Sequence, residues 1–194
     1  ASSHSLVEGS GNTVVGAYAM QNIIGGNTIE FGDWEYVSGK GNTAIGGSSM
    51  HAATGGSWNT ALGHVTLAHN TTGYNNVALG VNSLKQNTEG FDNVSVGAYS
   101  LKFNTTGNLN TSIGGHSLSN NKEGSSNTAI GSYALYNHLD SNNNVAIGVD
   151  AMQGAYDHEN QVSLVATGTY QINNERGISQ EFNHNFQNVA IGDS

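Results

Sequence analysis

The 194-residue sequence contains no cysteine and no proline. The absence of cysteine excludes disulfide bonds and thiolate metal sites. The absence of proline suits a chain committed almost wholly to paired strands, because proline has no backbone N–H to donate to a neighbouring strand. Stability must therefore come from backbone pairing and side-chain packing.

Charged residues are also scarce. They make up 10% of the chain, and the formal net charge is −9. Five lysines and arginines in total do not supply the basic face that neutralises nucleic-acid phosphates. No apolar run reaches the length of a membrane-spanning helix, and no signal peptide is visible. We therefore expect no nucleic-acid partner and no membrane insertion.

What the sequence has in abundance is a repeat of 17 residues. Each copy has Asn, then Thr or Val, a small residue, Ile, Leu or Val, and Gly, with Leu or Met four residues after the glycine. The central glycines are Gly46, Gly63, Gly80, Gly97, Gly114, Gly131 and Gly148. A fixed period of this length indicates a repeat architecture, and 17 residues are too few for a helical hairpin. The repeat predicts a β-solenoid.

We interpret each copy as one coil of short strands and turns. The period-2 alternation before the glycine predicts a strand whose Thr/Val and Ile/Leu/Val side chains point inward. The glycine permits a sharp turn, Asn-Thr-Thr-Gly forms the returning turn, and the asparagines are expected to stack into a ladder. The small residue of the strand would then face outward at Ala44, Ala61, Ala78, Ser95, Ser112, Ala129 and Ala146. Such a column suits close approach of another chain, so we predict a homotrimer, the simplest closed form.

The repeat also resembles known families. Asn-Thr-Ala-Ile-Gly at 127–131 and Asn-Val-Ala-Ile-Gly at 144–148 are similar to the repeated motif in the heads of trimeric autotransporter adhesins. The longer form with Asn-Thr-Thr-Gly resembles repeats of bacteriophage tail-fibre proteins. The resemblance covers about 11–152 and again 187–192, and it implies a left-handed parallel β-roll in a homotrimeric fibre. The adhesin heads generally use a shorter coil, which favours the fibre-type variant.

The repeat divides the chain into three parts. Residues 1–10 are a polar lead-in, 11–152 hold the repeats with an irregular coil at 26–40, and 153–194 hold degenerate repeats with loops at 153–161 and 169–187. The chain begins without Met and ends just after a further repeat core. We therefore expect further fibre segments at both ends.

Two groups of side chains within the repeats invite a functional interpretation. The irregular coil combines carboxylates with aromatics at Glu30, Asp33, Trp34, Glu35 and Tyr36, a combination that sugar-binding and glycoside-cleaving sites use. A column of Tyr99, His116 and Tyr133 would form a strip suited to sugars. For both groups we favour the structural interpretation, an atypical coil and ordinary stacking on the edge of a solenoid.

The loops of the last part are the candidate recognition site. Loops on a rigid solenoid escape the packing constraints of the coils. Aromatic faces suit sugar rings or a protein partner, and a guanidinium can fix orientation. The receptor-binding candidates are Tyr156, Tyr170, Arg176, Phe182 and Phe186. The alternative, which we favour, is that these loops are structural insertions.

The pattern predicts a structural and adhesive module of an extracellular trimeric fibre, on a virion tail or a bacterial surface. Its partner would be a cell-surface glycan or protein receptor. We expect no enzymatic activity, no cofactor and no metal. One alternative is a tailspike-type polysaccharide depolymerase using carboxylates between Asp157 and Glu181. Another is an ice- or mineral-binding solenoid, which requires an outward array of threonines, whereas the threonine slot is expected to face inward.

Overall fold

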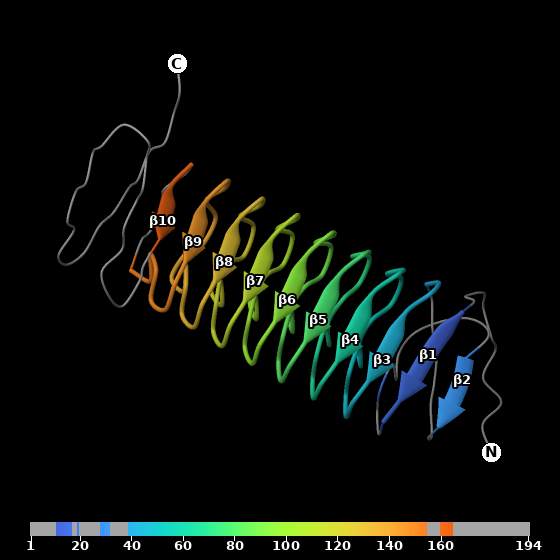
Figure 1. Cartoon of the computed structure of the whole chain (residues 1–194). Coiled ribbons are helices and arrows are strands. Elements are labelled where there is room, and N and C mark those ends of the chain that lie inside the picture. Colours follow the sequence, from blue (N-terminus) through green and yellow to red (C-terminus); the bar gives the residue numbers. More distant parts are fainter. Residues whose placement is uncertain (1–10, 17–18, 20–27, 32–38, 155–159, 165–194) are drawn as a thin grey trace, which may run out of the picture.

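The computed structural model describes residues 11–16, 19, 28–31, 39–154 and 160–164. In this part of the chain there is no helix, and one ten-stranded parallel sheet runs along an elongated rod (Figure 1). The strands are β1 Asn12–Val15, β2 Thr28–Phe31, β3 Thr43–Ile45, β4 Thr60–Leu62, β5 Val77–Leu79, β6 Val94–Val96, β7 Thr111–Ile113, β8 Thr128–Ile130, β9 Val145–Ile147 and β10 Val162–Leu164. The predicted all-β parallel β-solenoid is confirmed.

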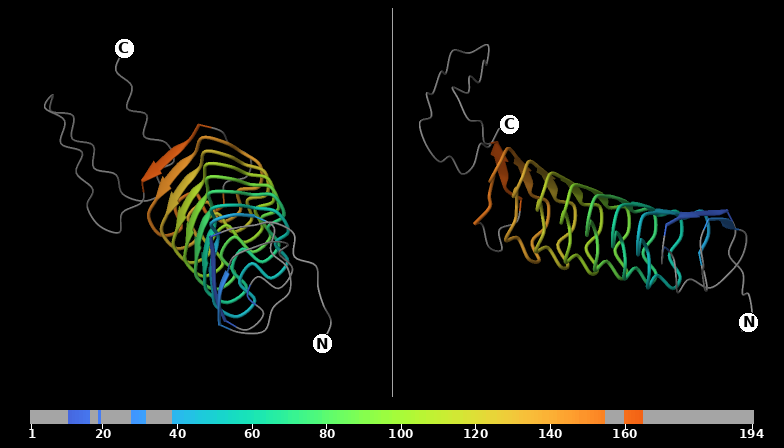
Figure 2. Two further views of the ribbon diagram at one scale, coloured as in Figure 1. Left: turned by 90° about the vertical axis from the view of Figure 1, so that its right-hand side faces the viewer. Right: turned by 90° about the horizontal axis from the view of Figure 1, so that it is seen from below.

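From β3 to β10 the strands follow chain order, and equivalent positions of successive repeats pair side by side. Ala129, for example, lies between Ser112 and Ala146. The rest of each coil closes behind the sheet, and the two further views show the coils as stacked loops (Figure 2). Because every coil repeats the same slots, each type of side chain forms a column along the rod.

The order changes at the N-terminal end, where the sheet reads β2–β1–β3. Asn12 joins the regular stack directly, since its Oδ1 accepts a 2.7 Å hydrogen bond from the backbone N–H of Asn42. Glu30 in β2 holds the same register position as Val14 in β1 and Ala44 in β3. That register position is the buried one in the regular coils.

The two faces of the strands are the reverse of those predicted from the alternation. The small residues face inward: Ala44, Ala61, Ala78, Ser95, Ser112, Ala129 and Ala146 are fully buried. The Thr/Val and Ile/Leu/Val residues on either side face outward, so both predicted orientations were wrong. The threonine slot that was expected to be inward is therefore outward at Thr43, Thr60, Thr111 and Thr128.

The physical reason is the narrowness of the coil. Alternation separates two sets of side chains but does not say which set is buried. The interior already holds a column of Leu and Met, composed of Met50, Leu67, Leu84, Leu101, Leu118 and Leu135. Beside this column there is room for alanine or serine from the strand, and not for two further large side chains.

The predicted asparagine ladder is confirmed and is buried. Each asparagine before a strand accepts, through Oδ1, a hydrogen bond from the backbone N–H of its equivalent one coil later. Asn110 Oδ1 accepts from Asn127 N–H at 2.9 Å, and Asn110 Nδ2 donates to the Gly124 carbonyl at 2.8 Å. A second ladder runs through the returning turns, where Asn104 Nδ2 donates to Asn87 Oδ1 at 2.8 Å and to the Gly107 carbonyl at 2.9 Å. These bonds satisfy polar groups that would otherwise be costly in the interior.

In each coil from the one around Gly63 to the one around Gly148, three non-glycine residues have a left-handed backbone. In the coil around Gly114 they are Leu109 at φ 58°, His116 at φ 59° and Leu118 at φ 46°. This conformation costs most L-residues roughly 1–2 kcal/mol, and asparagine and aspartate tolerate it better. At the position of Leu109 three other coils carry Asn75, Asp92 and Asn143, and two carry Trp58 and Ser126.

We expect Leu109→Asn to stabilise the fold of the single chain by about 0.5–1 kcal/mol, apart from any contact of Leu109 with another copy. Leu109 is 56% exposed, so its side chain contributes little to the interior of its own coil. Urea unfolding followed by circular dichroism measures the change. The reverse substitution Asn75→Leu should be destabilising by a similar amount, and two changes of the same sign would contradict the explanation.

Candidate functional site

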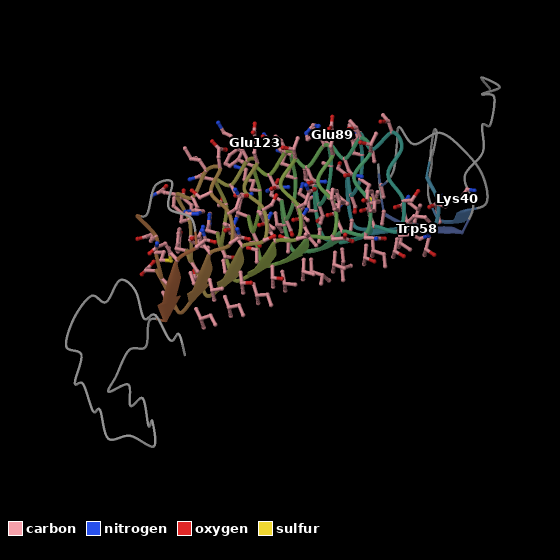
Figure 3. The ribbon with its side chains drawn as sticks, turned by 90° about the horizontal axis from the view of Figure 1, so that it is seen from above. Lys40, Trp58, Glu89 and Glu123 are labelled. Atoms are coloured by element: carbon pink, nitrogen blue, oxygen red, sulfur yellow. The ribbon has the colours of Figure 1, made fainter. Side chains whose placement is uncertain are left out.

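The outward side of the sheet is an apolar face, which we call the sheet face. It consists of two columns of side chains that alternate with the buried column, and Figure 3 shows them as a row of mostly carbon sticks projecting from the sheet away from the rod. One column holds Thr13, Thr43, Thr60, Val77, Val94, Thr111, Thr128 and Val145, and the other holds Val15, Ile45, Leu62, Leu79, Val96, Ile113, Ile130 and Ile147. These side chains are half-buried or exposed in the single chain.

The exposed large hydrophobic residues of the described chain all lie on this face or along its two edges. Five belong to the sheet face itself: Val15, Leu62, Ile113, Ile130 and Ile147. Val81 and Val149 directly follow the turn glycine at one edge. Trp58, Tyr74 and Leu109 lie just before the ladder asparagine at the other edge, and Figure 3 places Trp58 close to the sheet. Trp58 is the most exposed of the ten, at 62%.

A contiguous apolar surface of this kind marks a contact surface, because burying it against another apolar surface releases water. The sheet face carries no charged side chain on β1 or on β3 to β9. Its geometry suits association. The threonines are interrupted by Val77, Val94 and Val145 and are flanked by aliphatic residues, so they do not form the continuous threonine array expected of an ice-binding surface.

A second surface lies where the chain leaves the turn glycine. There the predicted Tyr99, His116 and Tyr133 column is a stack of parallel rings. The centroid distance from His116 to either tyrosine is 4.8 Å, with interplanar angles of 9° and 1°. Tyr136 meets Tyr133 edge-on at 5.3 Å, and the Nζ of Lys102 lies 5.4 Å from the centroid of the Tyr99 ring. The predicted stacking is confirmed.

The receptor-binding candidates in the C-terminal loops lie outside the described residues: Tyr156, Tyr170, Arg176, Phe182 and Phe186. Of the carboxylate and aromatic group in the irregular coil, Glu30 lies in β2, while Asp33, Trp34, Glu35 and Tyr36 lie outside the described part. The prediction that these residues form sites stays a prediction.

The sequence analysis missed the sheet face and the exposed Trp58 and Leu109 at its edge. A signal for the face was present. Ile, Leu and Val fill one slot in every copy, and a coil of 17 residues has little interior in which to place them together with Leu or Met.

Within the residues that the structure describes, no group of three His, Asp, Glu or Cys side chains is arranged to hold a metal ion. The same residues include no helix long and apolar enough to cross a membrane.

The fold and this surface define a class, the parallel β-solenoids with an exposed apolar sheet. No protein-family model, no curated protein and no solved structure matches this chain.

Proposed function

We propose that this chain is a structural and adhesive module of an extracellular fibre in which three copies associate through the sheet face. The single observation that carries the proposal is the concentration of exposed apolar side chains on the sheet face and its two edges. In this arrangement three rods of left-handed coils run side by side, and their sheets enclose a common apolar interior.

Three-fold symmetry suits the distribution of these residues. Two flat sheets packed face to face cover the sheet face but leave the residues at its edges near the outside. Three rods around an axis bring one edge of each copy against the opposite edge of the next, so the edge that carries Trp58 and Leu109 in one copy approaches the edge that carries Val81 and Val149 in its neighbour. Each Ile or Leu removed from water contributes roughly 1 kcal/mol. Summed over the columns, this exceeds the cost of association.

The resemblance of the repeat to tail-fibre and adhesin-head sequences supports the same proposal. A rigid rod with its coils in register projects whatever is attached to its ends, and the remaining surface of the rod is free to contact a receptor on a host or a neighbouring cell. The chain has no role as a catalyst in this proposal. It needs no cofactor, because the ladders and the backbone pairing hold the coils together.

The test is the oligomeric state of a charged variant of the sheet face. Ile130→Lys places an ammonium group in the middle of the apolar interface, where it is desolvated without a partner. Multi-angle light scattering should show a trimer of the 20.2 kDa chain for the wild type and a shift toward monomer for the variant. Thr106→Lys is the matched control, since Thr106 is exposed and lies in the returning turn, away from the sheet. A monomeric wild type, or equal dissociation of both variants, would contradict the proposal.

A further inference from the structure

A second surface of the rod, distinct from the sheet face, is positively charged although the chain is acidic. It is formed by the segments that begin two residues after five successive turn glycines, Gly63 to Gly131, namely residues 65–69, 82–86, 99–103, 116–120 and 133–137, which we call the post-glycine strip. The strip contains two of the lysines, Lys85 and Lys102, and no aspartate or glutamate, in a chain of formal net charge −9.

Most acidic side chains of the described rod lie elsewhere. Glu89, Glu123 and Asp140 belong to the returning turns, and Figure 3 shows Glu89 and Glu123 at the margin opposite the sheet. Asp92 precedes a ladder asparagine, and Asp150 follows Gly148, one coil beyond the end of the strip. The separation of charge has an effect within the strip. Partial desolvation lowers the pKa of His69, and the positive charges of Lys85 and His51 lower it further. The strip thus carries a positive potential that attracts anions.

One lysine of the strip, Lys102, stands beside aromatic rings. Lys102 Nζ lies 4.2 Å from the centroid of the Phe103 ring and 5.4 Å from that of Tyr99. Cation–π attraction of this kind restrains a side chain that is otherwise mobile. Lys85 occupies the equivalent slot one coil earlier, so two ammonium groups follow the axis of the rod. Successive paired strands are about 4.8 Å apart.

The orientation of the rings selects the kind of ligand. In the stack of Tyr99, His116 and Tyr133 the rings cover one another, so both faces of His116 are occupied and the edges of the stack remain for contact. Ring edges carry the positive end of the aromatic quadrupole, which favours anionic oxygens. Nucleic-acid bases require open ring faces on which to stack, and both faces of the central ring are covered.

We propose that the post-glycine strip binds an extended anionic polysaccharide, with its carboxylate or sulfate groups at Lys85 and Lys102 and its hydroxyl groups along the aromatic edges. The columns repeat at the interval of the coils, so the surface suits a chain of repeating units and not a small compact ligand. This inference rests on the proposed adhesive function and specifies its ligand and its place on the rod.

The test compares two double variants with the same change of charge. Lys85→Ser with Lys102→Ser removes the cations of the strip, and Lys40→Ser with Lys122→Ser removes two exposed lysines outside it. Affinity for polygalacturonate and for heparin is measured by isothermal titration calorimetry, with neutral dextran and a DNA duplex as further probes. We expect binding of both anionic polysaccharides and none of dextran. The strip variant should weaken binding at least tenfold, and the control should stay within about twofold of wild type.

Several outcomes would overturn the inference. They are equal losses in the two double variants, affinity for the DNA duplex as high as for the polysaccharides, or no polysaccharide binding by the wild type. Light scattering of the same samples separates this inference from the proposed assembly. An intact trimer that binds neither polysaccharide contradicts the proposed binding by the strip and is consistent with the proposed trimeric fibre. A monomer that binds the polysaccharides through Lys85 and Lys102 contradicts the proposed trimeric assembly and supports the proposed binding by the strip.

Discussion

Replacing Gly114 by alanine should lower the free energy of unfolding by at least about 3 kcal/mol, because a strained backbone and a steric clash act together. Gly114 has a φ of +136°, which side-chain-bearing residues rarely adopt. A Cβ atom there would lie 2.5 Å from the carbonyl oxygen and 2.6 Å from the carbonyl carbon of Gly131. Both obstructing atoms are backbone, and the coil of Gly131 is held by its own hydrogen bonds, so neither atom can move aside cheaply. Thermal and urea unfolding measure the loss.

The next residue provides the control. At Gly115 the nearest atoms to an added Cβ are Ser132 Oγ at 3.8 Å and the Ala98 carbonyl oxygen at 3.9 Å, which are ordinary contacts. Gly115→Ala should therefore change stability by less than about 0.5 kcal/mol. If the two variants had similar stability, the close stacking of the turns would not be the constraint that we describe.

Removing one asparagine of the buried ladder should have an effect of similar size. Asn110→Ala removes the acceptor of the Asn127 N–H, at 2.9 Å, and one of the two donors to the Gly124 carbonyl, at 2.8 Å, while Asn121 Nδ2 still donates to that carbonyl at 3.0 Å. The Asn127 N–H is left unsatisfied, which costs roughly 1–3 kcal/mol, and one further hydrogen bond is lost, so we expect a loss of about 2–4 kcal/mol in urea unfolding. Hydrogen exchange should show faster exchange at Asn127 and its neighbours.

Asn120→Ala is the comparison for this prediction. Asn120 is half-buried and its Nδ2 donates to Asn137 Oδ1 at 3.2 Å, without bridging backbone groups. We expect a loss below about 1 kcal/mol. A large effect at Asn120 or a small one at Asn110 would show that the ladder contributes less than its geometry indicates.

The fold class, the coil length and the asparagine ladder were predictable because they depend on periodicity, and seven copies make the period unambiguous. The orientation of the strand was not, because Thr128, Ala129 and Ile130 alternate equally well in either direction. Hydrophobicity favoured burying Ile130, while the limited volume of the coil places Ala129 inside. Because of this error the contact surface was predicted on the alanine column, whereas the structure exposes the isoleucine column.

The order of the first strands was beyond prediction for a different reason. Asn12 and Asn27 both begin plausible copies, and local sequence does not say which of them pairs with the regular stack. The Tyr99, His116 and Tyr133 stack, in contrast, follows directly from the period, since residues 17 positions apart occupy neighbouring coils.

The order β2–β1–β3 at the N-terminal end has a consequence for how the protein folds. In the regular part each coil closes on a partner 17 residues away, whereas the contact between Asn12 and Asn42 spans 30 residues. Loop closure over the longer distance costs only about 0.5 kcal/mol more. Folding can thus begin in any regular coil and extend in both directions one loop at a time. The N-terminal strand β1 need not wait for its sequence neighbour β2, because it can join the finished stack directly through β3.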